Sequence, residues 1–219
     1  MHWCIHEEKK GMEVMKDMDR KIILASQSPR RIQLLQQIGI DAEVRPSHLE
    51  ECIHSSDPAE VVRELALQKA GDIAAQYIPA GENGASHTEE NLPIKGPVVI
   101  GADTVVAVDG KILGKPKDHE EAYEMIRMIA GRKHQVFTGV AVVHDGKAES
   151  FVEKTDVHVY EMSDAEIRAY ADSEEPMDKA GAYGIQGAFG KFIRGIEGDY
   201  NTVVGLPVAH LYQVLKTLA

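Results

Sequence analysis

Two charged side chains interrupt apolar patterns in this sequence, and both are of types that act on phosphates. Asp103 stands in the run VVIGADTVVAV, residues 98–108, whose valines, isoleucine and alanines predict a buried strand. Lys69 falls on the apolar stripe of a predicted helix over residues 57–77, which contains Val62, Leu65, Ala66 and Ile73. Because an unpaired buried charge is costly, each of these residues needs a partner or a use.

Each of the two charges also has a purely structural interpretation. An aspartate at a bulge or a strand end can accept hydrogen bonds from backbone amides. A lysine on an apolar helix face can extend its side chain past that face to water. These single stretches leave both interpretations open, so the rest of the chain must decide between them.

The stretch SQSPRR, residues 26–31, has the composition of a phosphate-binding site. Ser28 is a good helix N-cap and Pro29 suits the first helical position, so the free amides of the helix start lie beside Arg30 and Arg31. Two arginines are unfavourable at the positive end of a helix dipole unless an anion binds there. The alternative is a solvated arginine pair held by acidic residues elsewhere.

Several other residues are weak candidates when each is taken alone. Lys115 follows a predicted hairpin. Glu50 and Glu51 could hold a hard divalent cation together with Asp103. Gln186 lies in a glycine-rich segment, where its amide could bind a base. Exposed lysines, solvated acidic pairs and glycine-rich turns are the ordinary alternatives. The sequence contains no Walker loop, no G-x-G-x-x-G fingerprint, no H-E-x-x-H and no G-x-S-x-G.

Composition restricts the class of partner. The net charge of −11 argues against a broad nucleic-acid surface or an anionic-membrane surface, although it permits a local basic pocket. Cys4 and Cys52 lie far apart in a chain without a long apolar span or a signal peptide, which predicts a protein of the reducing cytoplasm.

Strands and helices intermix along the chain without strict alternation, which predicts an α/β or α+β fold with a mixed sheet. Hairpin turns are expected at Asp109-Gly110 and Asp145-Gly146. The expected strands are 21–26, 41–46, 98–108 and two within 134–160. Helices are expected over 57–77, 119–131 and 205–218. Two more are expected to start at Pro29 and at the capping box Ser163–Glu166.

Two stretches differ in composition from the rest. Residues 1–20 are polar and rich in methionine, and they are expected to be a flexible N-terminal extension. Residues 79–97 are rich in glycine, proline and acids, which predicts a surface insertion without a chemical role. The remaining chain, 21–219, is expected to form one domain.

Taken together, LASQSPRR, GADTVV, GKP and DKAGAYGIQG…GDY…VVGLP resemble the Maf family of nucleotide pyrophosphatases, over about residues 21–218. The resemblance implies an elongated α/β fold related to inosine triphosphate pyrophosphatases, with a mixed sheet and a cleft between two lobes. It also implies hydrolysis of a nucleoside triphosphate to the monophosphate and pyrophosphate with Mg²⁺ or Mn²⁺. Members often form homodimers.

The same resemblance assigns roles position by position. Asp103 matches the family's catalytic acid/base and, with Glu51, its metal site. Arg31, Thr104 and Gln186 match the branch that acts on dTTP and UTP. The residues that match the substrate and phosphate pocket are Ser26, Arg30, Arg31, Lys69 and Lys115.

Two other functions remain open at this stage. One is a pyrophosphatase for modified or noncanonical purine triphosphates, against which Thr104 and Gln186 weigh. The other is a non-catalytic, nucleotide-binding regulator of cell division, which would need neither a base nor a full set of phosphate ligands.

Overall fold

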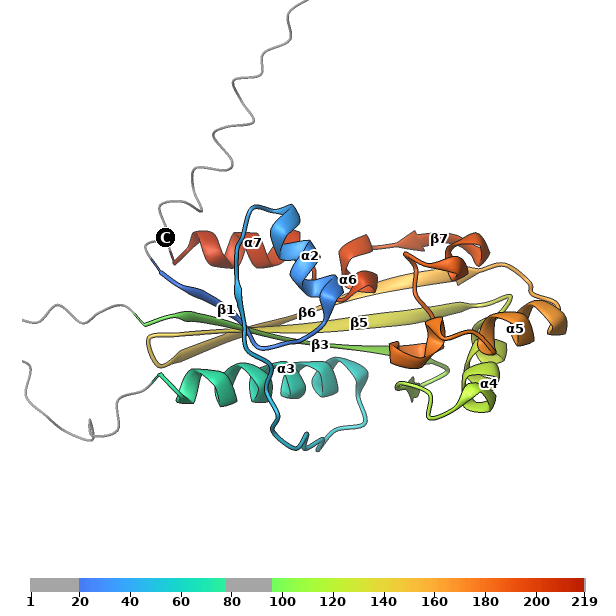
Figure 1. The fold of residues 1–219 in the computed structure, drawn as a ribbon, viewed down its shortest axis with the longest axis horizontal. Helices are drawn as coiled ribbons and strands as arrows, with labels where there is room; N and C mark the ends of the chain where they lie inside the picture. The colour runs from blue at the N-terminus through green and yellow to red at the C-terminus, as the bar shows by residue number, and fades with distance from the viewer. Residues whose placement is uncertain (1–19, 78–95, 219) are drawn as a thin grey trace, which may run out of the picture.

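The structure, a computed structural model, describes residues 20–77 and 96–218 and contains one mixed sheet flanked by helices (Figure 1). The predicted extension and insertion therefore lie outside the described residues, except at their edges. Arg20, assigned above to the flexible extension, is anchored: its guanidinium donates to the Gly96 carbonyl and pairs with Asp145. In the described part of the chain, no helix combines the length and apolarity needed to cross a membrane.

The sheet has seven strands in the order β2-β1-β3-β5-β6-β7, with β4 paired to β3. β1 is parallel to β2 and β3, and every other pair is antiparallel. The mixed sheet predicted from the sequence is therefore confirmed. The strands are β1 (Ile22–Leu24), β2 (Glu43–Val44), β3 (Val98–Val108), β4 (Lys111–Leu113), β5 (Lys133–His144), β6 (Lys147–Val159) and β7 (Ile193–Glu197).

Helices cover both faces of the sheet (Figure 1). α3 (Pro58–Ala75) packs on one face against β3 and β5, and α2 (Pro29–Gln37), α6 (Tyr200–Val204) and α7 (Val208–Lys216) lie on the other. Strand alternation in β3 therefore turns Val99 toward α3 and Ile100 toward α7. At the far end of the sheet, α4 (His119–Ile129) and α5 (Asp164–Ala171) enclose a separate hydrophobic core together with the segment around Phe189.

Local sequence signals explain where most elements begin and end. The Asp57 carboxylate accepts from two backbone amides of the first turn of α3, and the Asp118 carboxylate accepts from one, that of Glu121, at the start of α4. The capping box at Ser163 and Glu166 is present at the start of α5. Both predicted hairpins form, and Asp109 and Asp145 adopt the positive φ that such two-residue turns require.

The glycine-rich region near the C-terminus differs from the prediction. It contains 3₁₀ helices at Glu175–Asp178, Ala180–Ala182 and Ala188–Phe192, followed by strand β7, which the sequence pattern did not indicate. The predicted helix over 205–218 starts later, at Val208. Gly205 has a φ of 123° and ends α6, and Pro207 then provides the new helix start.

The edge of β3 that faces β1 and β4 is open at its middle. β1 pairs with Val98–Ile100 and β4 pairs with Val106–Val108, so within the described residues no strand covers positions 101–105 on that side. After Ala25 donates to the Ile100 carbonyl, the chain turns away from β3 and enters α2. Asp103 and Thr104 therefore lie at a gap in the sheet rather than deep inside it.

Two glycines allow α3 to lie unusually close to the sheet. A Cβ atom on Gly101 would overlap the Ala66 carbonyl oxygen, and one on Gly139 would overlap the Val62 carbonyl. Gly139 on β5 pairs with Asp103, two residues beyond Gly101 on β3, and both glycines face α3, so the helix backbone rests directly on strand backbone. This contact sets the height of α3 above Asp103.

We expect Gly101→Ala to destabilise the protein by about 1–3 kcal/mol, because α3 must move away from the sheet to admit the methyl group. Gly71→Ala on the same helix is the matched control. Gly71 is exposed with nothing within 4 Å of the added atom, so alanine should stabilise α3 by about 0.8–1 kcal/mol. Urea unfolding of both variants measures the two effects, and equal behaviour would contradict the close packing.

Candidate active site

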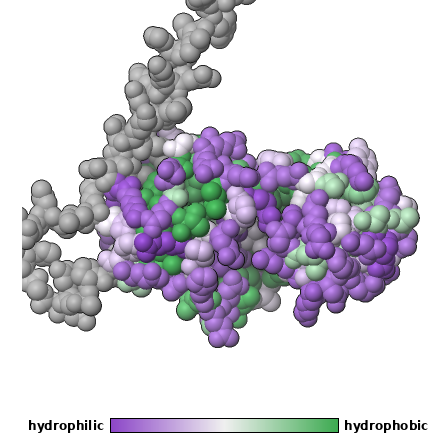
Figure 2. Space-filling model, viewed as in Figure 1, coloured by the Kyte–Doolittle hydropathy of each residue, from purple (hydrophilic) through white to green (hydrophobic). Residues whose placement is uncertain are grey.

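A cavity of about 980 Å³ lies over the gap in the β3 edge. Its walls come from the loop before α2, the loop before α3, the middle of β3, the loop after β4 and the glycine-rich segment. The site residues that the family resemblance assigns all line this cavity: Ser26, Arg30, Arg31, Glu51, Lys69, Asp103, Thr104, Lys115 and Gln186. Glu50, the other acidic candidate for a cation site, does not line it. In the space-filling view, hydrophilic residues border the hollowed middle of the molecule (Figure 2).

The two charges that interrupt apolar patterns pair with each other. The Lys69 Nζ atom lies 2.5 Å from Asp103 Oδ1 and 2.9 Å from Glu51 Oε1. The Lys69 and Asp103 side chains are 19% and 15% exposed, so the pair lies at the cavity wall and remains in reach of solvent. The structural alternatives for both residues, backbone capping and extension past the helix to bulk water, do not describe these contacts.

The loop that carries Glu51 is fastened to α3 along one helix face. Glu64, Gln68 and Asp72, spaced four residues apart, bond His54, Cys52 and Ser47 respectively. The Gln68 amide accepts from the Cys52 N–H at 3.0 Å and donates to the Cys52 carbonyl at 2.5 Å. Because Lys69 follows Gln68 on the same helix, this bidentate contact places Glu51 beside Lys69.

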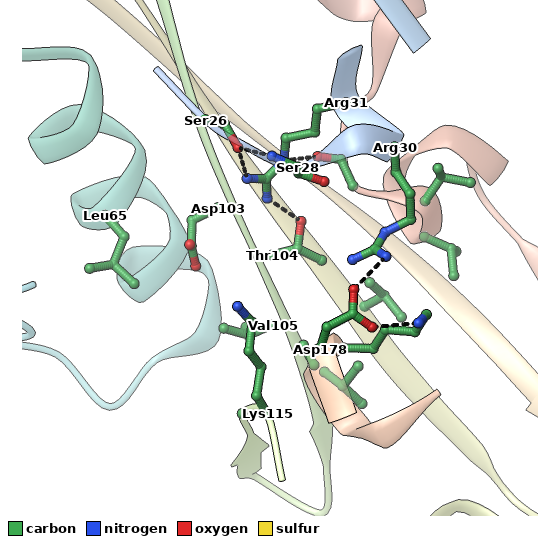
Figure 3. Close-up of a pocket in the computed structure, with 18 of the residues that line it drawn as sticks. Ser26, Ser28, Arg30, Arg31, Leu65, Asp103, Thr104, Val105, Lys115 and Asp178 are labelled. Atoms are coloured by element: carbon green, nitrogen blue, oxygen red, sulfur yellow. Dashed lines mark hydrogen bonds and ion pairs between the residues drawn. The ribbon is translucent and has the colours of Figure 1, made fainter. Parts of the chain in front are cut away.

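Arg31 is held by three hydrogen bonds within the protein. It donates to the Gly205 carbonyl at 2.8 Å, to Ser26 Oγ at 3.0 Å and to Thr104 Oγ1 at 3.2 Å (Figure 3). Burial lowers the pKa of Arg31, and the negative charge of Asp103 opposes that shift. The guanidinium therefore joins three segments that meet at the cavity: the loop before α2, strand β3 and the end of α6.

Thr104 continues this contact across the sheet. Its Oγ1 lies 2.9 Å from Thr138 Oγ1 on β5, and the Thr138 hydroxyl donates to the Thr202 carbonyl at 2.8 Å. Since the Thr138 proton is used on that carbonyl, Thr104 donates to Thr138 and accepts from Arg31. The threonine after Asp103 thus fixes the orientation of Arg31.

Arg30 has a different kind of partner. Its Nη1 atom lies 3.1 Å from Asp178 Oδ2, and Asp178 Oδ1 lies 2.5 Å from Lys179 Nζ (Figure 3). Burial opposes ionisation of Asp178, but Lys179 and Arg30 hold its pKa below the ordinary value. The Asp178 side chain is 61% exposed, so water screens its ion pair with Arg30.

Lys115 and Gln186 complete the cavity wall. Lys115 extends from the loop after β4 into the cavity (Figure 3), and Gln186 occupies the tip of a turn in the glycine-rich segment. Both residues are exposed, and no side-chain hydrogen bond to the described residues holds either of them. Their amine and amide are free to meet a ligand.

Some residues at the cavity were not predicted to have a role. Tyr183 lines the cavity, and its hydroxyl lies 2.8 Å from Nε2 of His134 on β5. His134 is fully buried, which lowers its pKa from 6.5 to about 4. Its Nδ1 atom has no partner among the described residues. Only the unusual position of a histidine at the start of an apolar strand could have indicated this pair.

The residues present fit a divalent cation held jointly with a phosphate ligand. Within residues 20–77 and 96–218, no group of three or more acidic, histidine or cysteine side chains is placed to hold a metal. Glu51 and Asp103 nevertheless converge on one point, the Lys69 ammonium. Two carboxylates suit Mg²⁺ or Mn²⁺ when phosphate oxygens supply further ligands.

The arrangement suits chemistry on a polyphosphate. A carboxylate, Asp103, faces an open cavity, and five cationic side chains line the same cavity: Arg30, Arg31, Lys69, Lys115 and Lys179. Cations stabilise the charge on phosphate oxygens, and a carboxylate can accept a proton from water.

Known proteins are similar to this chain over most of its length. The profile of the Maf family, described as "Maf-like protein", matches residues 21–218. A dTTP/UTP pyrophosphatase of Agathobacter rectalis is 51% identical over 203 residues, covering 90% of this chain and 97% of the relative. Proteins of the same name from Carboxydothermus hydrogenoformans and Bacillus cereus are 48% and 45% identical, over 90% of this chain and 97% and 95% of their own lengths.

The buried His134 predicts a loss of stability in acid. Above pH 6.5 the histidine is neutral in both states, whereas between 6.5 and about 4 only the unfolded chain binds the proton. We expect the free energy of unfolding to fall by about 3 kcal/mol more in the wild type than in His134→Gln between pH 7 and pH 4. His54→Gln, at a side chain 77% exposed, is the control and should follow the wild type. Parallel pH curves for the wild type and His134→Gln would contradict the assignment.

Proposed function

This chain belongs to the Maf family, and we propose that it hydrolyses nucleoside triphosphates, above all dTTP and UTP, to the nucleoside monophosphate and pyrophosphate. The observation that carries the proposal is the convergence of Asp103 and five cationic side chains on one cavity at a gap in the sheet. Relatives 45–51% identical over 90% of the chain are named for this activity. In the cell, the reaction would remove triphosphates from the nucleotide pool.

In the proposed reaction, water attacks the α-phosphorus and the bond from that phosphorus to the oxygen bridging it to the β-phosphorus breaks. Asp103 orients the water and accepts its proton. Lys69, Lys115, Arg30 and Arg31 bind the triphosphate and stabilise the negative charge that develops on its oxygens. The hydroxyl of Ser26 lies 3.0 Å from Nη1 of Arg31, where it binds the same phosphates.

A divalent cation would be held by Glu51 and Asp103 together with phosphate oxygens. When bound, Mg²⁺ or Mn²⁺ supplies positive charge against the triphosphate. Lys69, which contacts both carboxylates, would then be available to a phosphate oxygen. Thr104 and Arg31 set the shape of the pocket, and Gln186 contacts the base.

The proposal also covers the shape, the oligomeric state and the location of the protein. The two ends of the elongated sheet act as lobes on either side of a central cleft that contains the cavity. The enzyme works as a homodimer, as family members often do. The chain acts in the cytoplasm, where its nucleotide substrates are made and consumed. Light scattering of the purified protein tests the homodimer.

A substrate panel tests the reaction itself. With Mg²⁺ or Mn²⁺ present, we expect pyrophosphate release from dTTP and UTP to exceed that from the other canonical triphosphates. Release of single phosphate would indicate a γ-phosphatase instead. Turnover confined to modified purine triphosphates would replace the proposed substrates, and binding without turnover would support the regulatory alternative.

We expect Asp103→Asn to lower kcat by about 10²–10⁴-fold, because the amide cannot accept the proton of water. Asp156→Asn is the matched control. Asp156 lies on β6 with a side chain 13% exposed and pairs with Lys133 at 2.9 Å, but it does not line the cavity. The control should keep its turnover, and circular dichroism checks that both variants fold. Near-normal turnover by folded Asp103→Asn would refute the role of Asp103.

A further inference from the structure

Gln186 owes its position to the backbone that carries it. The Gly187 N–H donates to the Gly184 carbonyl at 3.2 Å, so residues 184–187 form a β-turn with Gln186 at its third position. Within the described residues, no hydrogen bond holds the Gln186 side chain itself. Whatever fixes this turn therefore decides where the amide lies in the cavity.

Two side chains from outside the cavity hold the turn on both sides. Glu175 accepts from the Ala188 N–H at 2.9 Å through Oε2 and from the Tyr170 hydroxyl at 2.9 Å through Oε1. The Gly184 N–H lies 3.4 Å from the Tyr170 hydroxyl oxygen. The two amides that flank the turn thus converge on one phenol–carboxylate pair, and neither Tyr170 nor Glu175 lines the cavity.

The glycines of the turn leave room for the side chains that hold it. A Cβ atom on Gly187 would overlap the Glu175 carboxylate, and one on Gly184 would lie 2.8 Å from Cε of Lys179. Lys179 in turn donates to the Glu175 carbonyl at 2.6 Å. The glycine at position 187 thus allows Glu175 to reach the Ala188 amide, while Tyr170 accepts from the Gly184 amide on the other side of Gln186.

The phenol of this pair is rigid. Tyr170 is 6% exposed, on helix α5, and its ring packs against Phe189 with centroids 5.0 Å apart. Burial raises the pKa of Tyr170, and the hydrogen bond to Glu175 acts in the same direction. The hydroxyl therefore keeps its proton and remains a donor to Glu175 at every physiological pH.

We propose that Tyr170 and Glu175 are positioning residues for base recognition, which fix the turn that presents the Gln186 amide to the nucleotide base. The inference rests on the proposed function, in which Gln186 contacts the base. An amide bonds a base edge only when its donor and acceptor meet their partners, so a displaced turn weakens base binding. The phosphate ligands, which come from other segments, are unaffected.

The test compares Tyr170→Phe with Gln186→Ala in the full-length enzyme. We expect each variant to lower kcat/KM for dTTP about three- to tenfold, the effect of losing one or two hydrogen bonds. Inhibition by inorganic tripolyphosphate, which probes the phosphate site alone, should keep its wild-type constant. The double variant should be no worse than Gln186→Ala, because Tyr170 acts only through Gln186. Multiplying effects, or an equal loss of tripolyphosphate affinity, would overturn the proposal.

Tyr123→Phe is the matched control. Tyr123 also donates its hydroxyl to a carboxylate, that of Asp164, in the same core, but it has no contact with the turn. This variant should keep the wild-type kcat/KM. A loss of activity like that of Tyr170→Phe would assign the effect to general loosening of this core and would overturn the proposal.

Hydrogen exchange provides a readout that does not need the substrate. The amides of residues 184–188 should exchange faster in Tyr170→Phe and in Glu175→Gln than in the wild type, and at the wild-type rate in Tyr123→Phe. If the wild type released no pyrophosphate from dTTP, the proposed function would fail. The exchange rates would still test whether Tyr170 and Glu175 hold the turn. Unchanged exchange in Tyr170→Phe would show that Tyr170 does not hold the turn, and would overturn the proposal even in an active enzyme.

Discussion

The close contact between α3 and the middle of the sheet determines the geometry of the whole site. Gly101 and Gly139 bring helix backbone onto strand backbone, and Asp103 lies two residues beyond Gly101 on the same face of β3. Lys69 therefore meets Asp103 at 2.5 Å. The same helix holds the loop of Glu51 through Gln68, so one helix positions both the cation and the second carboxylate. A larger residue at either glycine would move all three groups.

The gap in the edge of β3 explains how a charged pair can be stable in an apolar strand. A fully buried ion pair loses more by desolvation than it gains unless its geometry is excellent. Here β1 ends before Asp103 and β4 begins beyond it, so the carboxylate has protein on one side and the cavity on the other. Water and phosphate can reach Asp103, and the strand still provides a rigid support.

Much of this arrangement could be predicted from the sequence, because it depends on local rules. Caps at Asp57 and Asp118, two hairpin turns and the misplaced charges at positions 69 and 103 each have a signature within a few residues. Strand β7 could not, because it forms by pairing with β6, a contact between distant segments. The bond from Arg31 to the Gly205 carbonyl, for example, joins residues 174 apart. The family resemblance, rather than periodicity, assigned roles to Glu51 and Gln186.

The two adjacent arginines illustrate how neighbours in sequence acquire different tasks. Arg31 uses three donors on the protein, and these bonds connect the loop before α2 with Thr104 and Gly205. Moving it would leave a carbonyl and two hydroxyls without their donor, so Arg31 orders the pocket and keeps two N–H groups for the phosphate of the proposed substrate. Arg30 has one exposed partner, Asp178, and can exchange it for a phosphate oxygen at little cost.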